Sequence, residues 1–418
     1  MSKIFIIDVT NRDGVQTSRL GLAKLQKTMI NLYLNEMGIH QSEMGFPVTK
    51  HETHYLNANI ELAEMGALKP IILSGWCRAI TDDVKKAREM TRLEHINISI
   101  STSVQMTEGK FKDRILRRPS EEEPDKPSVL SMMKEGLKLA KELGFKTVGV
   151  NAEDASRTDD EFLIEFTQVA KEYGADRIRY CDTLGYNDPF VIYERVKHLA
   201  EVVGLDIEIH AHNDLGMACA CSVAGAKGAI DGGVNVYINT CINGMGERTG
   251  NADLVSVILA LKKSSGFEGK YPLDERVRLD CAWKIAKYTS YAFGVPIPIN
   301  QVAVGANAFA HESGIHADGA LKDRRNYELY GFEELGRGEP EIIETGRKIT
   351  AGEYSGIKGF RNVYEKLEIE FKDDEEATKI LELVRYANVH TQKPLTDGEL
   401  KFIATYPEIA RKVMTVTP

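Results

Sequence analysis

The chain has 418 residues, of which 43% are hydrophobic and 28% charged, and its formal net charge is −9. This composition is typical of a globular protein with one large and one smaller domain, and it argues against nucleic-acid binding and membrane insertion. The six cysteines do not predict a disulfide scaffold, and the start of the chain does not resemble a secretory signal, so we expect a cytoplasmic protein.

Eight short runs rich in Ile and Val alternate with longer amphipathic stretches. The predicted strands are residues 4–9, 39–44, 70–74, 96–101, 147–151, 177–181, 207–212 and 234–239. Helical patterns follow them at 22–37, 53–64, 81–91, 130–143, 159–173, 190–203, 217–231 and 252–264. Alternating strands and helices predict a parallel sheet, and eight such units match a (β/α)8 TIM barrel. A doubly wound open sheet is the main alternative.

The connection after the fourth predicted strand and the end of the chain depart from this alternation. Residues 107–127 are polar, with Pro and a run of Glu, and predict a solvated loop. The alternation stops near Gly266, after which residues 274–293 and about 367–413 have helical patterns. We therefore expect a catalytic TIM barrel over residues 1–266 and a C-terminal helical appendage over 267–418.

The segment DIEIHAHNDLG at 206–216 is the most informative one for function. His210 and His212 end an alternating apolar run, and strand residues two apart point to the same face. Both imidazoles could bind one divalent metal ion at the C-terminal end of a strand, where TIM barrels place their active sites. The motif by itself is explained about as well by two strand histidines that only form local hydrogen bonds as by a metal site.

Polar residues that follow the eight strands would converge at one mouth of such a barrel. They are Thr10, Arg12, Asp13, Gln16, Glu43, Arg78, Ser101, Ser103, Asn151, Glu153, Arg179, Asp182, Thr183, His210, His212, Asp214, Asn243, Glu247, Arg248 and Asn251. Asp13 with the two histidines supplies one oxygen and two nitrogen ligands, a set that suits Mn, Zn, Fe or Mg. A salt bridge between Arg12 and Asp13 at a turn is the alternative role for that pair.

Four motifs resemble those of the isopropylmalate synthase and homocitrate synthase family, in the same order. They are DVTNRDGVQ (8–16), HAHNDLG (210–216), NGMGERTGN (243–251) and FAHESGIHADG (309–319). The resemblance implies a TIM-barrel acyltransferase that condenses acetyl-CoA with a 2-oxo acid, a bound divalent cation (Mn, Mg, Zn or Co) and a homodimer with an exchanged C-terminal segment. One alternative is a lyase similar to hydroxymethylglutaryl-CoA lyase, and the HESGIH motif argues against it. The other is a non-enzymatic binding subunit, and the intact set of polar residues argues against that.

The resemblance also implies residue roles. Arg12 would face the carbonyl oxygen of the 2-oxo acid, and Thr183 would hold its carboxylate. His316 would abstract a proton in the partner subunit's active site, assisted by Glu153 and Tyr327. The implied metal ligands are Asp13, His210, His212 and Asn251. The other residues that we expect to bind substrate at the mouth are Gln16, Arg78, Asn151 and Arg179.

The chain departs from the family pattern at Gly149, where homocitrate synthases carry an arginine for the distal carboxylate of 2-oxoglutarate. The glutamate of many isopropylmalate synthases is absent there too. Arg179, four residues before Thr183, faces inward and either binds the second carboxylate of a shorter acceptor or forms a buried ion pair with Glu208. We expect oxaloacetate, as in the Re-face citrate synthases of this family, ahead of 2-oxoglutarate and 2-oxoisovalerate.

Overall fold

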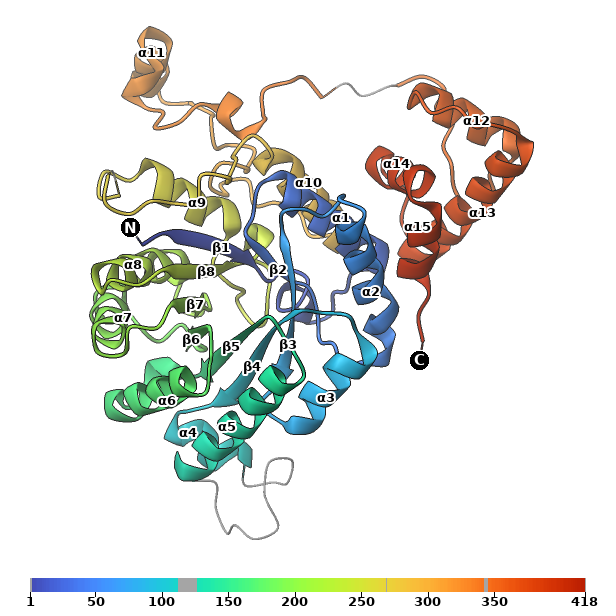
Figure 1. Ribbon diagram of the computed structural model, residues 1–418. Helices are drawn as coiled ribbons and strands as arrows, with labels where there is room; N and C mark the ends of the chain where they lie inside the picture. Colours follow the sequence, from blue (N-terminus) through green and yellow to red (C-terminus); the bar gives the residue numbers. More distant parts are fainter. Residues whose placement is uncertain (1, 112–125, 268, 342–344, 418) are drawn as a thin grey trace.

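A closed barrel of parallel strands forms the centre of the molecule (Figure 1). The computed structural model describes residues 2–111, 126–267, 269–341 and 345–417. The strands are β1 (Ile4–Asp8), β2 (Gln41–Glu43), β3 (Ile72–Arg78), β4 (His95–Ser101), β5 (Thr147–Glu153), β6 (Arg177–Asp182), β7 (Ile207–Ala211) and β8 (Val236–Thr240). Each strand pairs with the next, and β8 pairs with β1. The TIM-barrel prediction is confirmed, and a doubly wound open sheet is excluded because the sheet closes on itself.

Helices surround the barrel and bury one apolar face each against it. They are α1 (Lys24–Glu36), α2 (Lys50–Glu64), α3 (Thr81–Met90), α5 (Lys126–Glu142), α6 (Asp160–Glu172), α7 (Pro189–Val203), α8 (Ala218–Asp231) and α9 (Leu254–Lys263). Helix α7 shows how the sequence sets their limits. The Asp188 side chain accepts from the backbone N–H groups of Phe190 and Val191, Pro189 occupies the first turn, and Gly204 ends the helix at a φ of 63°.

The connection between β4 and β5 contains an additional helix, α4 (Val104–Phe111). Our prediction of a loop over 107–127 is therefore wrong for residues 107–111, and also for 126–127, which begin α5, whereas 112–125 lie outside the described residues. The helix forms because Ser103 precedes a run of helix-forming residues, and its hydroxyl accepts a hydrogen bond from the Met106 N–H at 3.3 Å. The polar composition of this segment concealed that short helix.

Buried charged and amide side chains occupy the barrel interior beside a small apolar cluster of Ile7, Val9 and Cys241. Arg177 on β6 donates to Glu208 on β7 at 2.6 Å, and Arg179 donates to the other oxygen of Glu208 at 2.6 Å. Arg179 also donates to both carboxylate oxygens of Glu43 on β2, across the barrel. These buried charges satisfy one another, as burial in a low-dielectric interior requires. Together they form a ladder of ion pairs that runs toward the barrel mouth.

At position 149, beside this ladder, a side chain would collide with a neighbouring residue. A Cβ atom at this position would lie 1.7 Å from Oδ1 of Asn97, on the neighbouring strand β4. Asn97 in turn donates from Nδ2 to Glu43 at 2.9 Å. The absence of the arginine that homocitrate synthases carry here thus has a steric cause in the structure.

The chain beyond residue 266 first returns to the barrel and then leaves it. Residues 272–274 bond to Ile4 of β1, and α10 (Ala282–Phe293) packs on α1. Helix α11 (Gly314–Lys322) projects from the barrel and has no buried residue (Figure 1). A final group, α12 (Ile357–Lys366), α13 (Asp374–Thr391), α14 (Asp397–Thr405) and α15 (Pro407–Met414), contacts α1 and α2.

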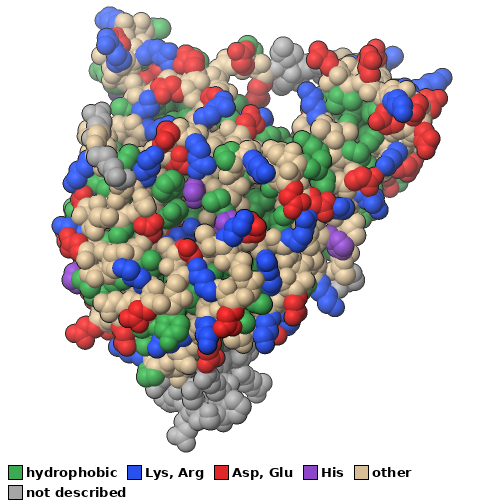
Figure 2. Space-filling model, in the orientation of Figure 1, with side chains coloured by type: hydrophobic (Ala, Val, Ile, Leu, Met, Phe, Trp, Pro, Cys, Tyr) green, Lys and Arg blue, Asp and Glu red, His purple; other side chains and the backbone are tan. Residues whose placement is uncertain are grey.

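The surface carries charges of both signs. Figure 2 shows Lys and Arg side chains interspersed with Asp and Glu over the face that it presents. No helix among the described residues is long and apolar enough to cross a membrane.

Candidate active site

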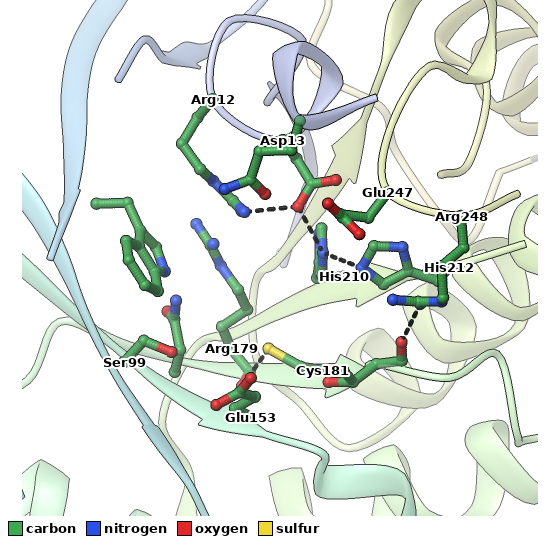
Figure 3. A pocket seen from close by; sticks show the side chains of 14 residues that line it. Arg12, Asp13, Ser99, Glu153, Arg179, Cys181, His210, His212, Glu247 and Arg248 are labelled. Atoms are coloured by element: carbon green, nitrogen blue, oxygen red, sulfur yellow. Dashed lines mark hydrogen bonds and ion pairs between the residues drawn. The ribbon is translucent and has the colours of Figure 1, made fainter. Parts of the chain in front are cut away.

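Asp13, His210 and His212 meet at the mouth of the barrel (Figure 3). Their nearest ligand atoms all lie within 4.8 Å of one another, and all three residues are buried. The two imidazole Nε2 atoms are 3.2 Å apart, and Nε2 of His210 lies 3.7 Å from Oδ2 of Asp13. Two nitrogen ligands about 2.1 Å from one ion lie roughly 3 Å apart, so this spacing suits a divalent cation.

Local hydrogen bonds do not account for the two histidines. Nδ1 of both rings is buried without a hydrogen-bond partner among the described residues. Asn251 also has a buried atom without a partner among the described residues. Its Nδ2 donates to Oδ1 of Asp13 at 2.7 Å, while its own Oδ1 has no hydrogen-bond partner. Two converging imidazoles, a carboxylate and an orphan amide oxygen are a donor set that fits a metal ion.

The protonation states of this cluster also fit metal binding. Burial lowers the pKa of His210 well below its ordinary value, and His212 lowers it further. Burial also lowers the pKa of His212. Burial acts to raise the pKa of Asp13, but Arg12 and the two histidines bring that pKa below its ordinary value. The site therefore offers neutral imidazoles and an ionised carboxylate, the forms that coordinate metals.

The loop after β8 is shaped around Asn251. The His212 backbone pairs with that of Asn251 in a short antiparallel bridge, which places the amide beside the histidines. At Gly246, whose φ is 155°, a Cβ atom would lie 2.0 Å from Nδ2 of Asn251. Glycine is therefore required where this loop crosses the amide.

Arg12 connects the metal-ligand cluster to the ion-pair ladder. Its Nη1 donates to Oδ2 of Asp13 at 2.6 Å, and its Nε donates to Oε1 of Glu43 at 2.6 Å. Burial acts to raise the pKa of Glu43, but Arg179 and Arg12 lower it well below its ordinary value. The salt bridge that we considered as an alternative role for Arg12 and Asp13 is present, and it leaves the guanidinium in the wall of the cavity.

A cavity of about 250 Å³ opens beside this cluster. Its wall includes nine of the predicted site residues: Arg12, Asp13, Gln16, Asn151, Glu153, Arg179, Thr183, His210 and His212. Five further residues complete it: Trp76, Ser99, Cys181, Glu247 and Arg248. Twelve of these fourteen residues have polar or charged side chains, so the cavity suits a small, charged, oxygen-rich ligand better than an aliphatic one.

Arg179 reaches the cavity wall with its hydrogen-bonding capacity already used. It is 1% exposed, and it donates to Glu43 and Glu208 as described above. Asn151, with its amide oxygen turned inward, accepts from Nη1 of Arg179 at 3.3 Å and from the Trp76 indole at 3.0 Å. The buried ion pair with Glu208 that we considered for Arg179 is thus present, with Glu43 as an additional partner.

Two neighbouring side chains hold the Glu153 carboxylate at the rim of the cavity. The Ser101 hydroxyl donates to its Oε2 at 2.5 Å, and Nζ of Lys110 lies 2.6 Å from each carboxylate oxygen. Thr183 lies nearby, and its hydroxyl accepts from the backbone N–H of Asp154 at 2.9 Å. Glu153 and Thr183 therefore face the same cavity from adjacent strands.

Four of the predicted site residues do not line this cavity: Asn251, which donates to Asp13 beside it, and Arg78, His316 and Tyr327. Arg78 is bound by both carboxylate oxygens of Asp83, at 2.8 and 2.9 Å, because that aspartate lies in the first turn of α3. His316 and Tyr327 belong to the segment around α11, where their rings lie 4.3 Å apart. Within one chain the structure pairs these two with each other rather than with the metal-ligand cluster.

Trp76, Ser99 and Cys181 line the cavity although the sequence did not single them out. Trp76 lies two residues before Arg78, and Ser99 lies two residues before Ser101. Strand alternation therefore places Trp76 and Ser99 on the inward face, farther from the barrel mouth than the residues that we predicted. Applying the alternation along the whole strand would have found them. Lys110 gave no such signal, since its helix was not predicted.

Comparisons with known proteins agree with this geometry. The HMGL-like family model matches residues 3–287, and the model of the homocitrate synthase post-HMGL domain-like family matches 303–391. The hydroxymethylglutaryl-CoA lyase from Pseudomonas aeruginosa superposes on 71% of this chain and 95% of its own with a TM-score of 0.55, at 15% identity, a likeness of fold alone.

Sequence relatives cover almost the entire chain. A Citrate (Re)-synthase from Dehalococcoides mccartyi is 60% identical, over 100% of this chain and 99% of that protein. The 2-isopropylmalate synthase 2 of Caldanaerobacter subterraneus is 38% identical over 96% and 94%, and homocitrate synthase 1 of a Nostoc species is 33% identical over 96% and 96%. The resemblance stated from the motifs is confirmed: the chain belongs to the HMGL-like family, together with these synthases.

Proposed function

We propose that the protein is an acyltransferase that condenses the acetyl group of acetyl-CoA with oxaloacetate and hydrolyses the thioester to give citrate. The observation that carries the proposal is the buried Asp13, His210 and His212 cluster beside Arg12, in a polar cavity at the barrel mouth. The 60% identity to a Citrate (Re)-synthase over the whole chain supports the same activity.

The chain's own residues would divide the chemistry among them. A divalent cation held by Asp13, His210, His212 and the Asn251 amide oxygen would supply Lewis-acid polarisation of the 2-oxo group. Arg12 lies where it can stabilise negative charge that develops on the carbonyl oxygen. Thr183 and Gln16, which both line the cavity, would bind the carboxylate of the acceptor.

The polar wall supports a dicarboxylate acceptor. A branched aliphatic acceptor needs an apolar surface, whereas the wall has Trp76 as its one large apolar side chain and otherwise includes polar residues such as Ser99 and Asn151. Asn97 fills the space that an arginine at position 149 would need, which speaks against 2-oxoglutarate held as in homocitrate synthases. Because Arg179 is saturated by Glu43 and Glu208, we propose that it contributes positive potential and bonds through Asn151 rather than a free bidentate clamp.

We also propose that the active enzyme is a cytoplasmic homodimer, with residues 1–266 as the catalytic barrel and 267–418 as the exchanged appendage. His316 and Tyr327 would then complete the cavity of the partner subunit, with His316 as the base for the acetyl methyl group. Exposed apolar side chains around them support a covered surface: Ile315 is 77% exposed, Leu321 89% and Leu329 72%.

Release of free CoA tests the proposal directly. Purified protein would receive acetyl-CoA, Mn²⁺ and one of four acceptors, oxaloacetate, 2-oxoglutarate, 2-oxoisovalerate or pyruvate, and a thiol reagent would report CoA. We expect the highest kcat/KM for oxaloacetate. A preference for 2-oxoisovalerate or pyruvate would refute the dicarboxylate proposal. Cleavage of hydroxymethylglutaryl-CoA without any condensation would instead identify a lyase.

A further inference from the structure

Helix α4 brings a lysine to the rim of the active-site cavity. The helix occupies the connection between β4 and α5, and Lys110 lies in its last turn. Its ammonium group reaches back over the end of β4, 3.3 Å from the Ser101 hydroxyl and 2.6 Å from each oxygen of Glu153. The additional helix thus serves to place one cation against one carboxylate of the cavity wall.

Lys110 differs from the other cations at the mouth in the partner that it has. Among the three arginines of the wall, Arg179 pairs with Glu208, Arg248 with Asp214, and Arg12 with both Glu43 and Asp13, so their partners belong to the ladder, to a neighbouring loop or to the metal-ligand cluster. The partner of Lys110 is Glu153, which itself faces the cavity. The Lys110 side chain is 52% exposed, so little packing holds it there apart from that contact.

We propose that Lys110 is a positioning residue that fixes the Glu153 carboxylate toward the cavity and balances its charge. This inference rests on the proposed function, in which Glu153 assists proton abstraction from acetyl-CoA. Ser101 holds one oxygen and Lys110 holds both, so the carboxylate has one orientation instead of several rotamers. Without the ammonium group, Glu153 would add an uncompensated negative charge beside a dianionic acceptor.

The position of Lys110 at the rim requires a positive charge more than one particular donor geometry. A lysine ammonium is a compact charge on a flexible stem, and it can follow the carboxylate as acetyl-CoA enters. The charge must be present, whereas its exact donor geometry matters less.

Steady-state kinetics of Lys110→Met, Lys110→Arg and Glu153→Gln with saturating Mn²⁺ test the proposal. We expect Lys110→Met to lower kcat roughly 10- to 100-fold, with the KM for oxaloacetate changed less than about threefold. Lys110→Arg should recover most of that loss. The double variant Lys110→Met/Glu153→Gln should be no worse than Glu153→Gln alone, because the lysine acts through the carboxylate.

A matched control separates positioning from a general effect of losing an ion pair. Lys146 forms a comparable exposed pair with Glu94 at 2.7 Å, at the start of β5 and away from the cavity, and Lys146→Met should leave kcat unchanged. Full kcat in Lys110→Met, or losses that multiply in the double variant, would overturn the inference while leaving the proposed function intact. If the wild type turns over none of the acceptors, crystal structures of the wild type and of Lys110→Met provide the test. An unchanged position of the Glu153 carboxylate in Lys110→Met would also overturn the inference.

Discussion

The barrel mouth and the α11 segment contribute to the proposed active site in opposite ways. The mouth is buried and tied together by ion pairs that extend from Arg177 through Glu208, Arg179 and Glu43 to Arg12. The α11 segment buries none of its helical residues, and its His316 contacts only the nearby Tyr327 ring among aromatic side chains of the described residues. The mouth is therefore organised within a single chain, whereas we propose that the α11 segment is completed by a partner subunit.

The most damaging change to the organised half is loss of a metal ligand. We expect His212→Ala to lose bound metal and to lower CoA release roughly a thousandfold or more, since His212 is one of the converging donors. Elemental analysis and the acceptor assay measure the two effects. His198→Ala, on the exposed side of α7, serves as the control. Stoichiometric metal in His212→Ala would remove the ligand assignment.

Complementation tests whether the exposed half works in a partner subunit. His316→Ala and His210→Ala proteins should each be inactive alone. Random subunit exchange between them should restore about a quarter of wild-type activity, because half of the dimers are mixed and each mixed dimer has one intact site. No recovery in heterodimers that mass spectrometry has verified would mean that each site is built from one chain.

The ladder should matter far more for stability than ion pairs in the appendage. Arg179→Met leaves the buried carboxylates of Glu43 and Glu208 without their shared partner, and we expect a loss of about 3–5 kcal/mol in unfolding free energy. Arg361→Met removes an exposed pair with Asp374 and should cost less than about 1 kcal/mol. Denaturant titration compares the two variants, and equal losses would contradict the distinction drawn between the regions.

A smaller effect is expected at the opposite end of the barrel from the mouth. Burial, with help from Arg276 and Arg177, lowers the pKa of His40 to about 4. Between pH 6.5 and about 4 the unfolded chain binds a proton there that the folded chain does not, so stability falls as the pH falls through that window. We expect His40→Gln, which can still accept from Arg276, to remove roughly 1–3 kcal/mol of this dependence. An unchanged pH profile of unfolding would contradict the assignment.

The sequence predicted the barrel and the metal-ligand cluster because both follow from local periodicity and from the shared end of parallel strands. It did not predict the partner of Arg78, because Asp83 enters through the orientation of α3. It predicted Glu208 beside Arg179 from adjacent strands, but not Glu43, which lies across the barrel. The α4 helix was missed because its segment is short and polar, and Lys110 was missed with it.

The Asn97 amide has a consequence for how acceptor preference could diverge among related barrels. An arginine introduced at position 149 alone would collide with that amide, and an earlier change at position 97 would release one oxygen of Glu43 from its hydrogen bond. Glu43 also holds Arg12 and Arg179, so the first step would disturb both before the second brought any benefit. Either substitution alone is therefore unfavourable, and under the proposed acceptor assignment a switch of acceptor would need replacements at both positions.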